Sequence, residues 1–141
     1  WSLFIVGNGK GSVMSGDKAV RLMLVDDDMH VRLMLRTVLD AESYDVAVEA
    51  DNGRSAVELF REHRPDITLM DIDMPEMNGI DALKAILKED KEACVVMLTS
   101  HTNVQIVDEC ILAGAVHFIR KDVTIEKLTD SLNTVIKACK K

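Results

Sequence analysis

The sequence predicts a single α/β domain built on a doubly wound, five-stranded parallel sheet with helices on both faces. Five short apolar runs alternate with five segments of helical periodicity. Three of the runs are almost continuously apolar, as expected for strands buried on both faces. The runs lie far enough apart for one crossover helix each, and such crossovers produce parallel strands with right-handed connections.

The predicted strands share a short apolar run bounded by turn-forming or charged residues. They cover residues 19–25, 45–50, 66–71, 94–98 and 116–119. The second run alternates only weakly between apolar and polar residues, so we expect it at an edge of the sheet.

The predicted helices share apolar residues at three- and four-residue spacing. They cover residues 29–42, 54–64, 79–90, 103–113 and 124–139. Asp28 can cap the first helix, because a short acceptor satisfies free backbone amides. Pro65 blocks continuation of the second, Asn78-Gly79 marks the start of the third, and Gly114 ends the fourth in a left-handed cap.

Composition excludes several classes of function. The chain has 141 residues, 48% of them hydrophobic, which suits the core of one domain. Its net charge of −7 disfavours nucleic acid as a direct partner, because such binding depends on neutralising phosphates. No uncharged apolar run is long enough to span a bilayer, so we expect no membrane association.

The three cysteines, Cys94, Cys110 and Cys139, are odd in number and widely spaced in apolar contexts. This pattern predicts neither a disulfide framework nor a zinc site. We expect small buried side chains in a reducing environment, and therefore a cytoplasmic protein.

Residues 1–17 differ from the rest of the chain. Four of the seven glycines fall there, and the chain does not begin with Met. We interpret this segment as a flexible extension or a cloning remnant. The folded domain is then expected over 18–141.

Asp71 is the residue around which a site is predicted. It ends a short apolar run and is followed at once by a turn containing Pro75. A carboxylate at the carboxyl end of a buried strand has no ladder partner and is free for chemistry. We therefore expect Asp71 to be a nucleophile toward phosphoryl groups.

Other polar residues also follow predicted strands. Strand one ends in Asp26 and Asp27, strand four in Thr99, and strand five in Lys121. The carboxyl ends of parallel strands meet at one edge, and ligands bind there where the strand order reverses. If the first strand is central, the crevice lies between it and the strand that carries Asp71.

The predicted crevice is crowded with acidic groups. The candidates are Asp26, Asp27, Asp28, Asp71 and Asp73, with Lys121 opposing them. Like charges this close raise one another's pKa, and a divalent cation relieves the repulsion. Magnesium (Mg2+) prefers oxygen ligands and keeps several waters, which leaves room for phosphoryl oxygens. Taken alone, Asp28 and Asp73 are better explained as a helix cap and a turn residue.

Four motifs resemble the receiver domain of bacterial two-component response regulators. They are Leu24-Val25-Asp26-Asp27-Asp28, Met70-Asp71-Ile72-Asp73-Met74-Pro75-Glu76-Met77-Asn78-Gly79, Leu98-Thr99-Ser100 and Phe118-Ile119-Arg120-Lys121. They occur in the family's order, and the resemblance covers about residues 19–139. It implies the flavodoxin-like strand order 2-1-3-4-5.

The resemblance also implies a metal site with assigned roles. Asp71 is the expected phosphoacceptor and a direct Mg2+ ligand together with Asp27. The backbone carbonyl of Asp73 is the third protein ligand, and Asp26 acts through water.

The same resemblance implies a switch. Thr99 and Lys121 form the phosphoryl-sensing pair, and the rotamer of Phe118 follows phosphorylation. The donor is a histidine kinase or a histidine phosphotransfer protein. Phosphorylation is expected to reshape the face made by helix 103–113, strand 116–119 and helix 124–139, and so to alter binding of a downstream protein. A phosphorylation-dependent dimer is a further partner state. On this interpretation the chain is no enzyme beyond its own phosphotransfer and dephosphorylation.

The chain departs from the family after Lys121, where Asp122 replaces a proline that is often preceded by a cis bond. A cis bond without proline costs roughly 2.5–4 kcal/mol, so we predict a trans Lys121–Asp122 bond.

The fourth helix is apolar over more than one stripe. Its apolar residues are Val104, Ile106, Val107, Cys110 and Ile111. Some must be exposed, which indicates a partner surface, although a helix tucked against its neighbours is an alternative.

Two other functions compete. Asp71-Ile72-Asp73 with Thr99 and Lys121 resembles aspartate-nucleophile phosphatases of the haloacid dehalogenase type, in which the second aspartate is the general acid–base. Those enzymes carry further acids downstream, whereas here the acidic pair lies upstream. The other alternative is an interaction module that is never phosphorylated.

Overall fold

The computed structural model describes residues 19–100 and 104–139, which form one parallel sheet flanked by helices. The strands are β1 (Arg21–Val25), β2 (Asp45–Ala50), β3 (Ile67–Asp71), β4 (Val95–Thr99) and β5 (His117–Arg120). They pair in the order β2-β1-β3-β4-β5. This confirms the predicted fold class and the edge position of β2. The predicted extension at residues 1–17 lies outside the described residues and stays a prediction.

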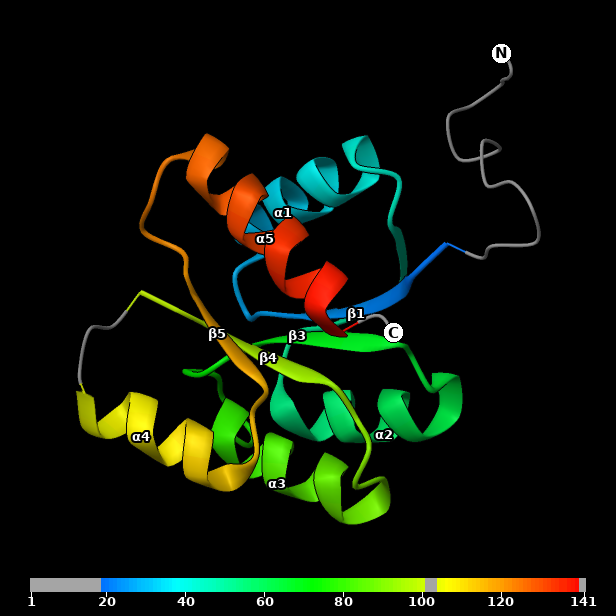
Figure 1. The fold of residues 1–141 in the computed structure, drawn as a ribbon. Coiled ribbons are helices and arrows are strands. Elements are labelled where there is room, and N and C mark those ends of the chain that lie inside the picture. The colour runs from blue at the N-terminus through cyan, green and yellow to red at the C-terminus, as the bar shows by residue number, and fades with distance from the viewer. Residues whose placement is uncertain (1–18, 101–103, 140–141) are drawn as a thin grey trace.

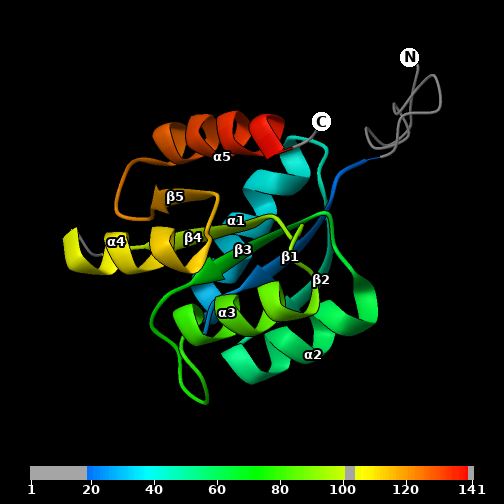
Figure 2. The same ribbon diagram turned by 60° about the horizontal axis from the view of Figure 1, so that its bottom comes forward.

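The helices lie in two layers, one on each face of the sheet. They are α1 (Met29–Ala41), α2 (Gly53–His63), α3 (Gly79–Glu89), α4 (Val104–Ala113) and α5 (Ile125–Cys139). α1 and α5 cover one face, and α2, α3 and α4 cover the other (Figure 1). On that second face α3 lies between α2 and α4, in contact with both (Figure 2). The predicted bounds agree within one or two residues, and Asn103, the predicted first residue of the fourth helix, lies outside the described residues.

The core consists of two clusters separated by the sheet. In β1, Leu22 and Leu24 join the cluster that includes α1 and α5 residues, whereas Met23 and Val25 join the cluster that includes α2 and α3 residues. This alternation follows from the two-residue period of a strand. All four side chains are fully buried, and burying each contributes about 1.5–3 kcal/mol. β1 is therefore firmly anchored at the centre of the sheet.

Aspartate and asparagine side chains cap the starts of α1, α2 and α3. The Asp28 carboxylate accepts from the His30 backbone N–H at 2.8 Å, and Asn78 accepts from the Asp81 N–H at 2.9 Å. Asn52 caps α2 in the same way. These bonds satisfy amides that have no partner inside the helix. At the C-terminal end of α4, Gly114 has a φ of +109°, as the predicted glycine cap requires.

Gly79 permits α3 to begin against the end of β3. Its N–H donates to the Ile72 carbonyl at 2.7 Å. A Cβ at this position would lie 2.1 Å from the Asp71 carbonyl oxygen. A glycine is therefore required for the close approach that supports the backbone of Asp71.

The prediction for the cysteines was wrong for two of the three. Cys94, just before β4, and Cys139, the last residue of α5, form a disulfide with a Cα–Cα distance of 6.6 Å. That distance suits such a bond. Cys110 is buried and free, as predicted. The pair was missed because the packing of α5 on the sheet joins residues 45 positions apart.

Within the described part of the chain, no helix combines the length and the apolar character that crossing a bilayer would need.

Candidate functional site

Three strands deliver charged side chains to one point at the carboxyl edge of the sheet. Asp26 directly follows β1, Asp71 is the last residue of β3, and Lys121 directly follows β5. The Lys121 Nζ lies 2.8 Å from Asp26 Oδ2 and 3.0 Å from Asp71 Oδ1. One ammonium therefore bridges two carboxylates that are far apart in the sequence.

The acidic residues around this point form a set of oxygen ligands. Carboxylate oxygens of Asp26, Asp27 and Asp71 lie within 4.8 Å of one another. Asp28 and Asp73 line the same cleft, whose volume is ≈ 350 Å³, together with Ser100 and the residues above. Hard oxygen donors at this spacing fit Mg2+ better than softer metals. The structure thus brings together all five predicted carboxylates, while their individual roles stay predictions.

Burial and charge act strongly on Asp71. Its residue is 6% exposed and Asp26 is fully buried. Burial is the largest of the effects that together raise the pKa of Asp71 from its ordinary value of 3.8 to about 6. The charges of Asp26 and Asp27 also raise this pKa, while Lys121 lowers it. A cation held in the cleft would favour the ionised carboxylate by offsetting this repulsion.

For Lys121, the neighbouring carboxylates together have a larger effect on the pKa than burial does. Burial lowers the pKa of its ammonium, but hydrogen bonds to Asp26 and Asp71 outweigh burial and raise it overall. Lys121 is therefore cationic at neutral pH.

Asp26 is fixed from several directions. Its backbone N–H donates to the Ala50 carbonyl at 3.1 Å, which continues the pairing of β1 with β2. Its Oδ1 accepts from the Asp28 N–H at 2.9 Å, while Oδ2 accepts from Lys121. Asp27, by contrast, is exposed and lines the cleft. The buried carboxylate is thus held rigidly, and its neighbour faces the solvent side of the site.

Asp28 serves mainly as a helix cap. Hydrogen bonds from the backbone amides of His30 and Val31 hold its pKa below the ordinary value. This confirms the interpretation favoured for Asp28 when it is taken alone.

Thr99 lies on β4, the strand next to β3, and Phe118 lies on β5, the edge strand beyond β4. Thr99 ends β4 and is buried, and its carbonyl accepts from the Lys121 N–H at 2.8 Å. This backbone hydrogen bond to β4 fixes the position from which the Lys121 side chain extends into the site. Phe118 is partly buried against the core cluster on the α2–α4 face. Their positions suit the predicted switch, which stays a prediction.

The loop after β5 has the predicted backbone. No cis peptide bond occurs in residues 19–100 or 104–139, so the Lys121–Asp122 bond is trans. The Asp122 side chain turns to Arg120, whose Nε donates to Oδ1 at 2.9 Å. Asp122 is thus engaged with its own strand rather than with the acidic cleft.

α4 has an exposed apolar surface, as its sequence indicates. Cys110 is buried, whereas Val104, Ile111 and Leu112 are 69%, 58% and 86% exposed. The helix is therefore only partly covered by its neighbours.

Sequence reasoning missed one residue that contacts the site backbone. Arg32 of α1 donates from Nη1 to the carbonyl oxygen of Asp26 at 2.6 Å. The only signal in the sequence is a cation one helical turn after the Asp28 cap, and this signal is weak.

Comparisons with known proteins agree with the geometry. The family model described as the response regulator receiver domain matches residues 22–133. A chemotaxis protein CheY of Thermotoga maritima is 44% identical over 117 residues, covering 83% of this chain and 98% of the relative. A chemotaxis protein CheY of Bacillus subtilis is 38% identical, covering 84% of this chain and 98% of the relative.

Solved structures show the same fold. The response regulator domain of Thermotoga maritima CheB has a TM-score of 0.79 and 33% identity, covering 86% of this chain and 97% of that one. The CheX-CheY-BeF3-Mg+2 complex from Borrelia burgdorferi has a TM-score of 0.78 and 30% identity, covering 83% and 89%.

Proposed function

Because the chain belongs to the response regulator receiver family, we propose that it is a phosphoacceptor switch in which Asp71 takes a phosphoryl group from a phosphohistidine donor. The observation that carries the proposal is the bridge from Lys121 Nζ to Asp71 and Asp26, two carboxylates that together with Asp27 are able to hold one cation. Nucleophile, counter-charge and metal ligands thus meet at one edge of the sheet.

In the proposed transfer, an Asp71 carboxylate oxygen forms a bond to phosphorus as the bond from phosphorus to the donor imidazole nitrogen breaks. The imidazole keeps that electron pair. Asp26, Asp27 and Asp71, with the Asp73 carbonyl, would hold Mg2+, which when bound neutralises charge on phosphoryl oxygens. Lys121 moves from the Asp71 carboxylate to a phosphoryl oxygen, and Thr99 donates a hydrogen bond to another.

The output would be a change in protein binding. Phosphorylation adds charge and acceptor oxygens beside Thr99 and Lys121, which lie at the ends of β4 and β5. Phe118 on β5 would then change rotamer and alter the face made by α4, β5 and α5. The exposed apolar side chains of α4 support a protein target there. The similar CheY in complex with CheX gives further support for a protein partner.

We further propose a histidine kinase or phosphotransfer protein as donor and the cytoplasm as location. The net charge of −7 supports a protein rather than a nucleic acid as the direct target. A phosphorylation-dependent dimer stays a prediction. The chain would act as a switch that catalyses only its own phosphotransfer and dephosphorylation.

The test is labelling with radioactive acetyl phosphate, with and without Mg2+, in the wild type, Asp71→Asn and the matched control Asp73→Asn. We expect transient, stoichiometric label that requires Mg2+ and Asp71. Label persisting undiminished in Asp71→Asn would mean that another residue is the acceptor.

The same preparations separate the competing functions. Steady turnover of a phosphate ester, abolished in Asp73→Asn, would favour the phosphatase. An absence of label, together with amide signals near Phe118 that do not shift on adding beryllium fluoride and Mg2+, would favour the unphosphorylated interaction module.

A further inference from the structure

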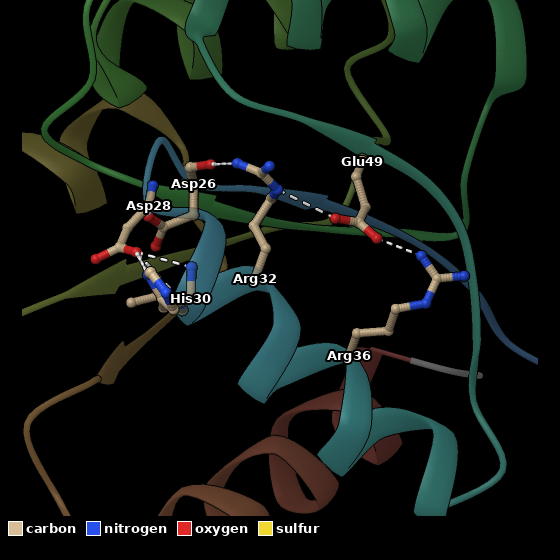
Figure 3. Close-up of polar contacts among 7 residues, drawn as sticks. Asp26, Asp28, His30, Arg32, Arg36 and Glu49 are labelled. Atoms are coloured by element: carbon tan, nitrogen blue, oxygen red, sulfur yellow. Dashed lines mark hydrogen bonds and ion pairs between the residues drawn. The ribbon is translucent and has the colours of Figure 1, made fainter.

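The Arg32 guanidinium joins the turn after β1 to the edge strand β2. Its side chain is 18% exposed. Nη1 donates to the Asp26 carbonyl oxygen at 2.6 Å, and Nε donates to Glu49 Oε1 at 3.1 Å (Figure 3). A planar guanidinium can make both bonds at once because its donors point in fixed directions.

The carbonyl that Arg32 contacts belongs to the peptide group between Asp26 and Asp27. A peptide group is planar, so holding its oxygen also sets the direction in which the Asp27 backbone leaves. Asp26 is already fixed through its backbone N–H and both carboxylate oxygens. Among the three carboxylates that can share one cation, Asp27 is the exposed one, and its placement therefore depends more on this turn.

Glu49 holds Arg32 in place from the other side. Its second carboxylate oxygen pairs with Nη1 of Arg36, one helical turn further along α1 (Figure 3). The Arg36 side chain is 46% exposed and forms ion pairs with Glu49 and Asp40. The two arginines thus share one carboxylate, but Arg32 is the one that reaches the site backbone.

We propose that Arg32 is a positioning residue for the cation site: it orients the peptide between Asp26 and Asp27, and Glu49 supports it. The inference rests on the proposed function in taking Mg2+ as the ion. Residues that orient metal ligands without touching the metal typically change affinity by about 10–100-fold when removed. Since Arg32 acts at one remove, through a backbone carbonyl, we expect the lower end of that range.

Charge and positioning predict opposite results, which makes the inference testable. Removing the positive charge of Arg32 near an acidic site would by itself strengthen the attraction for Mg2+. Losing the oriented peptide would weaken Mg2+ binding. Arg36→Ala removes an equal charge from the same carboxylate without touching Asp26, so it is the matched control.

The experiment measures Mg2+ affinity of the full chain by isothermal titration calorimetry at about 0.15 M salt, where charges beyond about 8 Å are screened. We expect Arg32→Ala to bind Mg2+ about 10-fold more weakly. Arg36→Ala should bind as the wild type does, or slightly more tightly. Affinity in Arg32→Ala equal to or above that of the wild type would overturn the inference, and so would equal weakening in both variants.

Two further variants separate positioning from general structural damage. Arg32→Lys keeps the charge but replaces the planar guanidinium, whose donors point in fixed directions, with a compact ammonium that does not reproduce this geometry, so it should also bind Mg2+ more weakly. If Arg32→Ala does not fold, the Mg2+ affinity of Arg32→Lys is compared with that of the wild type instead, and an affinity equal to or above that of the wild type would overturn the inference. Glu49→Gln should weaken Mg2+ binding when it is introduced into the wild type. It should cause no further weakening in the Arg32→Lys variant, because Glu49 acts on the site only through Arg32. Additive losses would contradict this.

The outcome for the wild type distinguishes the two proposals. If the wild type binds Mg2+ and is labelled at Asp71, while Arg32→Ala and Arg32→Lys keep full Mg2+ affinity, only the role of Arg32 is overturned. A wild type that binds no Mg2+ would overturn both proposals.

Discussion

Asp71 should make the protein less stable as the pH rises through the weakly acidic range. Its folded-state pKa is raised from 3.8 to about 6 by burial and by Asp26, so the folded state holds this proton more tightly than the unfolded chain does. The contribution of Asp71 to the free energy of unfolding therefore decreases between roughly pH 4 and pH 6 and stays low above that range. The difference between the folded-state and unfolded-state pKa of Asp71 corresponds to about 3 kcal/mol in the free energy of unfolding.

The perturbation that isolates this effect is Asp71→Asn. Asparagine keeps the shape and an oxygen acceptor for Lys121 but carries no charge. Lys121 loses one ionic partner, which offsets part of the gain. At about pH 8 without Mg2+, we therefore expect the variant to be about 1–3 kcal/mol more stable than the wild type. Near pH 4.5 the difference should largely disappear, because Asp71 is then mostly protonated in the folded wild type.

The assay is urea unfolding followed by circular dichroism from about pH 4.5 to pH 8 in the presence of a chelator. Asp108→Asn, an exposed carboxylate of α4, is the control for a change of one charge and should show little effect. Adding Mg2+ should reduce the advantage of Asp71→Asn, because the cation favours the ionised wild type. The reasoning would be refuted if the stability difference between Asp71→Asn and the wild type did not change with pH. It would also be refuted if the wild type were more stable than Asp71→Asn at about pH 8.

Three other perturbations have defined outcomes. Lys121→Met leaves the Asp26 and Asp71 carboxylates without their bridging ammonium. We expect labelling by acetyl phosphate to slow about 100-fold, and an unchanged rate would contradict the role of Lys121. Gly79→Ala places a Cβ 2.1 Å from the Asp71 carbonyl oxygen, so the free energy of unfolding should fall by about 1–3 kcal/mol in urea; an unaltered midpoint would show that the loop yields at no cost. Thiol titration of the unfolded chain should detect only Cys110 before reduction and three thiols after it. Because the disulfide closes a loop of 45 residues, reduction should lower the free energy of unfolding by up to about 4 kcal/mol.

Local patterns were enough to predict the framework. β1 and β3 are short apolar runs buried on both faces, and α1 and α3 begin at the Asp28 and Asn78 caps found in the structure. These features depend on residues within a few positions of one another, so the sequence displays them directly. Parallel strands then require their carboxyl ends to meet, which is why Asp71 could be expected beside other strand-end residues.

Contacts between distant segments could not be predicted in the same way. The disulfide depends on how α5 lies across the sheet, and the Arg32 bond to the Asp26 carbonyl depends on the angle between α1 and β1. The register of β2 against β1, which shifts between Leu22 and Met23, places Glu49 where it can hold Arg32. Such placements result from packing many side chains at once, and no short motif records them.

Which elements form and which residues end each strand followed from the order of residues alone, and so did the gathering of acidic groups and a lysine at one edge. The folded arrangement was needed to show that Lys121 bridges Asp26 and Asp71, that burial raises the pKa of Asp71 toward neutral pH, and that Arg32 supports the turn beside them. The physical reason is that residue periodicity is a local property, whereas distance, burial and charge in a site depend on segments that meet only after folding.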